Sequence, residues 1–213
     1  MTKGVPMRFQ FLSCAIVASA ALLTGCSKGG ADSSTATPAA TASATGSAAQ
    51  AAPAVVPGTH YPAQGHKHFA EGESTAFHYN SDPPTSGSHK ELFNDTFVSP
   101  TPLPKFLQVH LLEHGNVLLQ YNCECPDVAA ALAQIAYEYD AQQVPSNHLQ
   151  PLPADVQAAE EGGLAVIVAP YSGMKHKIAL TAWTRLATLD RVDKSKIEGF
   201  INAYLHNAAN LNQ

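Results

Sequence analysis

Apolar positions in the second half of the chain follow two different spacings. Apolar residues alternate with others over 117–121 and 178–182, and the run 164–169 is apolar throughout. Alternation is typical of half-buried strands, and a short continuous run favours a buried central strand. Over 128–139 and 197–205 the apolar residues recur every three or four positions, which predicts amphipathic helices. The predicted order is therefore strand, helix, strand, strand, helix.

The flanking residues support these assignments. Pro126 suits the first position of the earlier helix, and Asp193 suits the N-cap of the later one. The segment 140–162 contains three prolines, so we expect a loop with a short helical piece. Residues 106–111 form either a short strand or the start of a helical turn, which Gly115 ends.

Together these elements predict an α+β domain, in which a small mixed sheet carries two main helices. Residues 60–105 come before them and are rich in Pro, Gly, Ser, Asn and His. A long segment with so many turn residues has little regular structure, and such segments are usually functional.

The N-terminus is predicted to be a targeting segment. Basic residues precede a short apolar run, which is the anatomy of a signal peptide, here residues 1–25. Residues 23–26 read Leu-Thr-Gly-Cys and resemble the bacterial lipobox, which implies acylation of Cys26 and a membrane anchor. Residues 26–57 are almost all Ala, Ser, Thr, Gly and Pro and are expected to form a flexible linker. Ser27 follows Cys26, and a serine there favours an anchor in the outer membrane. We therefore expect the protein to face the periplasm.

The remaining residues, 58–213, are predicted to form a single globular domain. They carry nine Lys and Arg against sixteen Asp and Glu. An acidic domain is not expected to bind nucleic acid through a basic surface. All ten histidines also lie in this part of the chain, so its chemistry is more informative than its charge.

His110 and His114 enclose the string H-L-L-E-H. Positions four apart share a face in a helix and also in a strand, so both imidazoles can reach one ion. The string matches the inverted zinc-peptidase motif, but Gly115 and a strand-like pattern follow at once, which disfavours a long helix there. The simpler alternative is a pair of histidines that only make structural hydrogen bonds.

Residues 83–89 read Pro-Pro-Thr-Ser-Gly-Ser-His, and 110–115 read His-Leu-Leu-Glu-His-Gly. With the strand ending at Tyr121, the Thr-Ala-Trp segment 181–183 and a C-terminal helix, the chain resembles the bacterial family of exported domains of unknown function numbered 3105. The resemblance covers residues 60–207, and it implies a fold but no activity. The family also keeps a histidine upstream, for which His68 or His66 is the match.

We interpret these residues as a transition-metal site for copper or zinc. The predicted ligands are His89, His110 and His114, with His68 as a further ligand. Glu113 would orient a ligand from outside the coordination sphere. We therefore expect metal handling or sensing rather than an enzyme.

Cys123 and Cys125 form a second candidate site. In an exported protein two such cysteines either close a small disulfide or bind a soft metal, and their place before a helix also suits thiol–disulfide exchange. Met174 and His176 could add ligands for Cu(I). Nine residues, partly strand, separate His114 from Cys123, so two separate sites are expected. The remaining alternative is a structural or interaction lipoprotein with no metal.

Overall fold

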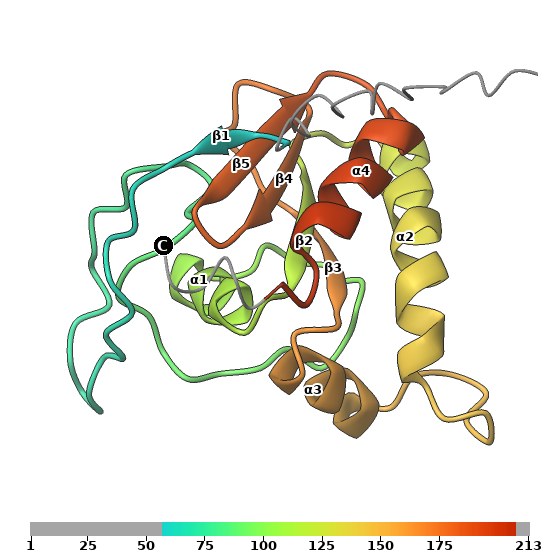
Figure 1. Cartoon of the computed structure of the whole chain (residues 1–213), viewed down its shortest axis with the longest axis horizontal. Helices are drawn as coiled ribbons and strands as arrows, with labels where there is room; N and C mark the ends of the chain where they lie inside the picture. Colours follow the sequence, from blue (N-terminus) through green and yellow to red (C-terminus); the bar gives the residue numbers. More distant parts are fainter. Residues whose placement is uncertain (1–56, 208–213) are drawn as a thin grey trace, which may run out of the picture. The chain divides into compact units, whose positions relative to one another are not determined.

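Five strands form one mixed sheet in the computed structural model, which describes residues 57–207 (Figure 1). Their order across the sheet is β1-β5-β4-β2-β3. The pair β2–β3 is parallel, and the other three pairs are antiparallel. The strands are β1 (Thr59–His60), β2 (Val117–Tyr121), β3 (Val166–Pro170), β4 (Ile178–Ala182) and β5 (Arg185–Leu189).

Four α-helices and one short 3₁₀ turn accompany the sheet. They are α1 (Lys105–Glu113), α2 (Pro126–Asp140), η1 (Ala141–Gln143), α3 (Pro153–Glu161) and α4 (Lys194–Tyr204). This arrangement confirms the predicted α+β class, with its mixed sheet and with α2 and α4 as the two longest helices. The short helical piece expected within 140–162 is α3. Pro126 opens α2, and the Asp193 side chain accepts a hydrogen bond from the Lys196 amide at the start of α4.

The alternation of β2 divides the core between the two faces of the sheet. Val117 and Leu119 point toward α2 and α4, whereas Leu118 points toward α1 and α3. All three side chains are fully buried. Because both faces of β2 are covered by helices, the sheet forms the middle of three layers (Figure 1). The layer that contains α1 also carries the candidate chemistry.

The segment between β1 and α1 has little regular structure, as expected, but it is closely packed against the rest of the domain. A single parallel bridge joins His68 to His89, and another joins Val98 to Val168 of β3. Thr85 is fully buried, and its carbonyl oxygen accepts a hydrogen bond from the Thr184 amide over 2.9 Å. These contacts hold the loop beside α1, with its polar backbone satisfied by other segments.

Three predictions lie outside the described residues: the signal peptide over 1–25, the acylated Cys26 and nearly all of the linker over 26–57. No helix within the described range 57–207 is long and apolar enough to span a bilayer.

Candidate metal centre

Helix α1 supplies two members of the candidate site. It begins after Pro104 and runs for nine residues, and its apolar side chains pack into the core on the α1 side of the sheet. His110 and Glu113 lie three positions apart and therefore project from neighbouring points on one face. The open choice for residues 106–111 is thus decided in favour of helix. Packing of this segment against the sheet explains the outcome, because nine residues alone make a marginal helix.

The long loop supplies the other two members. Backbone hydrogen bonds run from the Phe69 amide to the His89 carbonyl, over 2.7 Å, and from the His89 amide to the Lys67 carbonyl, over 3.0 Å. This pairing places His68 next to His89 although 21 residues of sequence separate them. Their ring centroids lie 4.6 Å apart.

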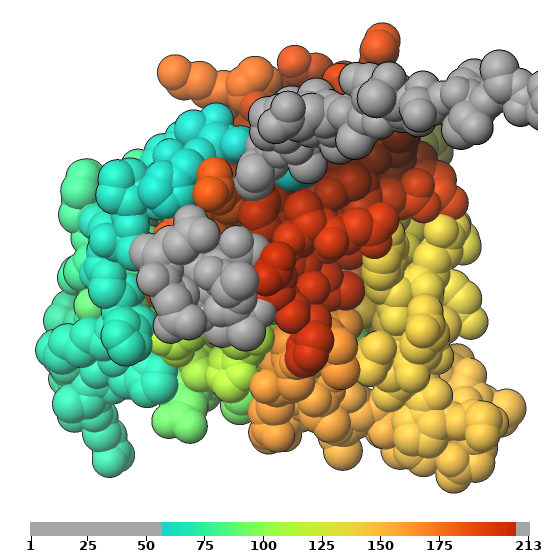
Figure 2. Space-filling view, viewed as in Figure 1, coloured from blue at the N-terminus to red at the C-terminus, as the bar shows by residue number. Residues whose placement is uncertain are grey.

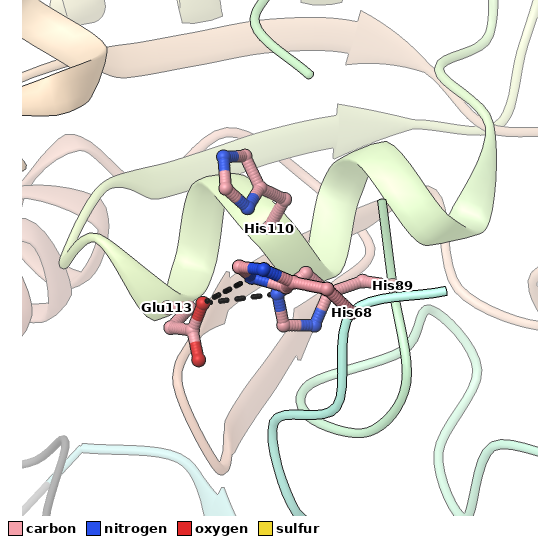
Figure 3. Close-up of side chains that lie close together, drawn as sticks. All are labelled: His68, His89, His110 and Glu113. Atoms are coloured by element: carbon pink, nitrogen blue, oxygen red, sulfur yellow. Dashed lines mark hydrogen bonds and ion pairs between the residues drawn. The ribbon is translucent and has the colours of Figure 1, made fainter. Parts of the chain in front are cut away.

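His68, His89, His110 and Glu113 converge on one point (Figure 3). Each offers one ligand atom, and these four atoms all lie within 4.8 Å of one another. Oε2 of Glu113 lies 2.9 Å from Nε2 of His89 and 3.3 Å from Nε2 of His68. Ligand atoms about 2.0–2.2 Å from a tetrahedral ion are themselves about 3.3–3.5 Å apart. The group is therefore close to the size that an ion such as zinc requires.

His89 has the orientation of a metal ligand. Its side chain is fully buried, and Nδ1 lies 2.8 Å from the Gly87 carbonyl oxygen. A carbonyl oxygen only accepts hydrogen bonds, so Nδ1 carries the proton. Nε2 faces Oε2 of Glu113 and the centre of the group, so without a metal a proton lies between these two atoms, and loss of that proton would leave the Nε2 lone pair free to bind an ion. Histidine ligands in metal sites are commonly held in this way.

His110 differs from the other members of the group in the hydrogen bonding of its ring nitrogens. Both ring nitrogens are buried and have no hydrogen-bond partner among residues 57–207. A buried polar atom without a partner costs about 1–3 kcal/mol. Burial lowers the pKa of His110 to about 4, and repulsion from His114 and His89 adds to the effect. A neutral imidazole with an unused lone pair is the form that binds a metal ion.

Glu113 supplies the negative charge of the group. Burial alone would raise its pKa, but the hydrogen bond from His89 and the histidines around it lower the pKa overall. Its Oε1 also lies 3.5 Å from Nδ1 of His66, and Nδ1 of His68 lies 4.0 Å from Oε2 of the exposed Glu91. The carboxylate therefore occupies a position among the four candidate ligand atoms, which differs from the orienting role predicted from the sequence.

The structure places His114 beside the group of four and not in it. Its Nδ1 donates a hydrogen bond to the Glu161 carbonyl oxygen over 3.0 Å. The ring centroids of His114 and His110 lie 4.7 Å apart. The Phe93 ring contacts both imidazoles, with its centroid 5.1 Å from that of His110 and 5.4 Å from that of His114. No atom of His114 is among the four ligand atoms that lie within 4.8 Å of one another, and its role as a ligand, predicted because positions four apart share a helix face, stays a prediction.

Two features of the site could not be identified from the sequence. The first is the position of Glu113 among the four candidate ligand atoms, for which the three-residue spacing from His110 is a signal only when 105–113 is known to be a helix. The second is Phe93, which covers His110 and His114. A lone phenylalanine in a polar loop gives no signal of this kind.

The two cysteines are joined to each other. Cys123 and Cys125 form a disulfide with a Cα–Cα distance of 5.1 Å, which is one of the two states that the sequence left open. Disulfide sulfurs are not thiolates, so a soft metal site on this pair stays a prediction for the reduced protein.

Met174 and His176 have partners outside the histidine group. The Met174 carbonyl oxygen accepts a hydrogen bond from the Asn122 side chain. Nδ1 of His176 lies 3.1 Å from Oδ1 of Asp190. Both residues line an open cavity of about 600 Å³ near β1 and β5. The structure thus gives no sign that they add ligands to the group of four.

The fold and this site define an α+β domain whose long loop and first helix bring three imidazoles and a carboxylate together. The family described as "Protein of unknown function (DUF3105)" matches residues 70–213, and the chain belongs to that family. This confirms the resemblance drawn from the histidine motifs. No matching curated protein and no matching solved structure was found.

Proposed function

We propose that this protein binds one transition-metal ion, copper or zinc, through His68, His89, His110 and Glu113, and that it serves metal handling or sensing in the bacterial cell envelope. The observation that carries the proposal is the pair of buried, unpartnered ring nitrogens of His110 beside three other ligand groups. A bound ion would satisfy one of these nitrogens. It would also occupy the space between the His89 lone pair and the carboxylate.

The ligand types favour zinc or copper over harder ions. Imidazole nitrogen is a preferred ligand of both metals, whereas magnesium and calcium prefer oxygen ligands only. One carboxylate also reduces the net charge of a divalent ion in a partly buried place. Copper and zinc are therefore the ions to test first.

Four protein ligands support binding rather than turnover. A catalytic zinc usually keeps one position open for water or substrate, whereas a site with four protein ligands is closed. His89 and His110 are buried, while His68 is 45% exposed. Such a site holds its ion from the buried side and exchanges it through the exposed ligand, which suits handling or sensing.

A lipid anchor on Cys26 is part of the same proposal. The support is the signal-peptide pattern and the lipobox-like residues 23–26 in the sequence. About 31 linker residues would span roughly 30 Å as a flexible chain, which separates the metal domain from the membrane surface. The expected location is the outer membrane, facing the periplasm. Mass spectrometry of the native protein tests the anchor, because Cys26→Ser should remove all acyl groups. An unmodified wild-type Cys26 would contradict it.

Metal content tests the site. We expect the purified wild-type protein to retain about one zinc or copper ion per chain, measured by inductively coupled plasma mass spectrometry. His68→Ala removes a half-exposed ligand without opening the core, and His110→Ala removes the buried one. Both variants should lose most of the metal.

His114→Ala is the matched control, because the structure keeps this histidine outside the group of four. It should retain the metal. Equal metal in His68→Ala, His110→Ala and the wild type would overturn the proposal. Loss of metal in His114→Ala as well as in His110→Ala would favour the ligand set predicted from spacing.

A further inference from the structure

The turn between β2 and α2 contains the disulfide of Cys123 and Cys125. Both cysteines are half-buried, so a reagent in solution can reach the pair. The metal-ligand group of His68, His89, His110 and Glu113 includes neither cysteine. The disulfide is therefore a chemically separate feature of the domain.

The turn is held in place without the disulfide. The Asn122 amide donates to the Lys177 carbonyl over 2.9 Å, and the Asn122 side chain donates to the His176 carbonyl over 3.2 Å. These bonds fasten the end of β2 to the segment before β4. A disulfide across a single intervening residue closes a very small ring and removes little chain entropy from the unfolded state. The bond thus adds little to the stability of the fold.

The position of Cys125 favours its thiolate. Cys125 is the N-cap of the fifteen-residue helix α2, and no side-chain hydrogen bond caps that helix start in the described structure. Serine or aspartate at an N-cap normally accepts a hydrogen bond from a first-turn amide. A thiolate at Cys125 would take the same place, with further stabilisation from the helix dipole. Both effects lower the pKa of a thiol and make its sulfur a better leaving group.

We propose that Cys123–Cys125 is an exchangeable disulfide that oxidises dithiols of other proteins in the cell envelope, independently of the metal site. In the first step a thiolate of the partner attacks Sγ of Cys123. A bond forms between these two sulfurs, the Cys123–Cys125 bond breaks, and its electron pair remains on Sγ of Cys125.

The second thiolate of the partner then attacks the partner sulfur of this mixed disulfide. The partner's disulfide forms, and Cys123 leaves as a thiolate, which takes up a proton. In sum the dithiol loses two electrons and two protons. The cysteine pair gains two electrons and one proton, which is on Cys123, and the other proton goes to the solvent while Cys125 remains a thiolate. The reaction therefore balances without any further reactant.

Two acidic residues disfavour the thiolate of Cys125, so replacing one of them should change the reactivity of this thiol. Glu124 stands between the cysteines, and Asp127 lies in the first turn of α2. Their negative charges disfavour a second negative charge nearby. Asp127→Asn should therefore lower the pKa of the Cys125 thiol and leave the cysteine pair and the metal ligands unchanged.

The test is thiol exchange by the purified protein in glutathione buffers, in the absence of oxygen. We expect the pair to equilibrate as a two-electron couple when its thiols are alkylated and counted by mass spectrometry. The wild type should oxidise a reduced dithiol peptide at least about tenfold faster than the double variant Cys123→Ser/Cys125→Ser. Circular dichroism checks that the double variant is folded.

Single variants distinguish the two sulfurs. Cys125→Ser should accumulate a mixed disulfide of Cys123 with glutathione, and Asp127→Asn should react with iodoacetamide at lower pH than the wild type after reduction. His68→Ala should exchange thiols as fast as the wild type, which separates this proposal from the metal site. A pair that stays oxidised in excess dithiothreitol, or a dithiol oxidation rate unchanged in the double cysteine variant, would overturn the inference.

Discussion

Nε2 of His89 lies 2.9 Å from Oε2 of Glu113, although the first residue belongs to the long loop and the second to helix α1. Because His89 Nδ1 donates to the Gly87 carbonyl oxygen, Nε2 is the ring atom that is available to face the carboxylate. A lone pair and a carboxylate attract each other only when a proton or a metal ion lies between them. This single contact therefore couples the path of the loop to the occupancy of the site.

Glu113→Gln should weaken zinc binding by about 10- to 100-fold. The amide keeps the shape of the side chain but lacks the negative charge that stabilises a divalent ion. Competition with a chromophoric chelator measures the change. Glu91→Gln is the control, because Glu91 is 74% exposed and lies 4.0 Å from His68. Equal losses in both variants would indicate a general charge effect instead of a ligand.

Removal of the metal should loosen the loop that carries His68 and His89. The Phe69 and His89 amides pair the two loop segments. The rings of His68 and His89 contact that of His110, with centroids 5.6 and 5.3 Å apart, and a metal ion would add bonds that join all three. Hydrogen exchange of these amides should accelerate after chelation, while exchange of the buried β2 amide of Leu119 should not change. Identical exchange with and without chelator would contradict a connecting role for the ion.

Asp140→Asn should reduce the pH dependence of stability. Burial raises the pKa of Asp140 to about 8, so the folded protein keeps a proton that the unfolded chain loses near pH 4. The wild type should therefore lose stability as pH rises from about 4 to about 8, by at most about 1.4 kcal/mol per unit from this group. In the wild type the Val166 amide donates a hydrogen bond to Asp140 Oδ1 over 2.8 Å. The Asn variant keeps an oxygen acceptor for this amide.

Urea denaturation at several pH values measures this difference between the two proteins. Glu160 has a pKa raised to about 8 by burial and contributes in the same direction, so part of the slope should remain in Asp140→Asn. Stability curves that run parallel for the wild type and the variant would show that Asp140 is not protonated in the folded state.

Gly163→Ala should destabilise the protein by more than about 3 kcal/mol. Gly163 has a φ of +66°, and an added Cβ would lie 2.1 Å from the His114 carbonyl oxygen. Gly65→Ala is the control, since Gly65 has a φ of +81° with no atom near an added Cβ. It should cost only about 1 kcal/mol, for the backbone conformation alone. Thermal unfolding compares the two variants, and equal costs would mean that the contact with His114 is relieved elsewhere.

Much of the sheet and the two longest helices could be predicted because their signals are local. The apolar spacing of α2 and α4 and the alternation in β2 and β4 are visible in windows of a few residues. The sequence did not decide between strand and helix for α1 because polar Gln108 and His110 lie among the apolar residues of this nine-residue segment. Both side chains are buried in the fold. Strand β5 is only partly buried, so its sequence shows little alternation. In both places packing against other elements decides the conformation.

For the site, the sequence by itself determined the chemistry that is present: a histidine-rich loop, the H-x-x-E-H string and a pair of cysteines. Only the tertiary structure decided which side chains meet. His68 and Glu113 are 45 residues apart, and their contact depends on how the loop pairs with itself and packs on α1. His114 has the right spacing from His110, yet it contributes no atom to the group of four. Spacing limits which residues can share a face, whereas contacts distant in sequence select those that lie within reach of one ion.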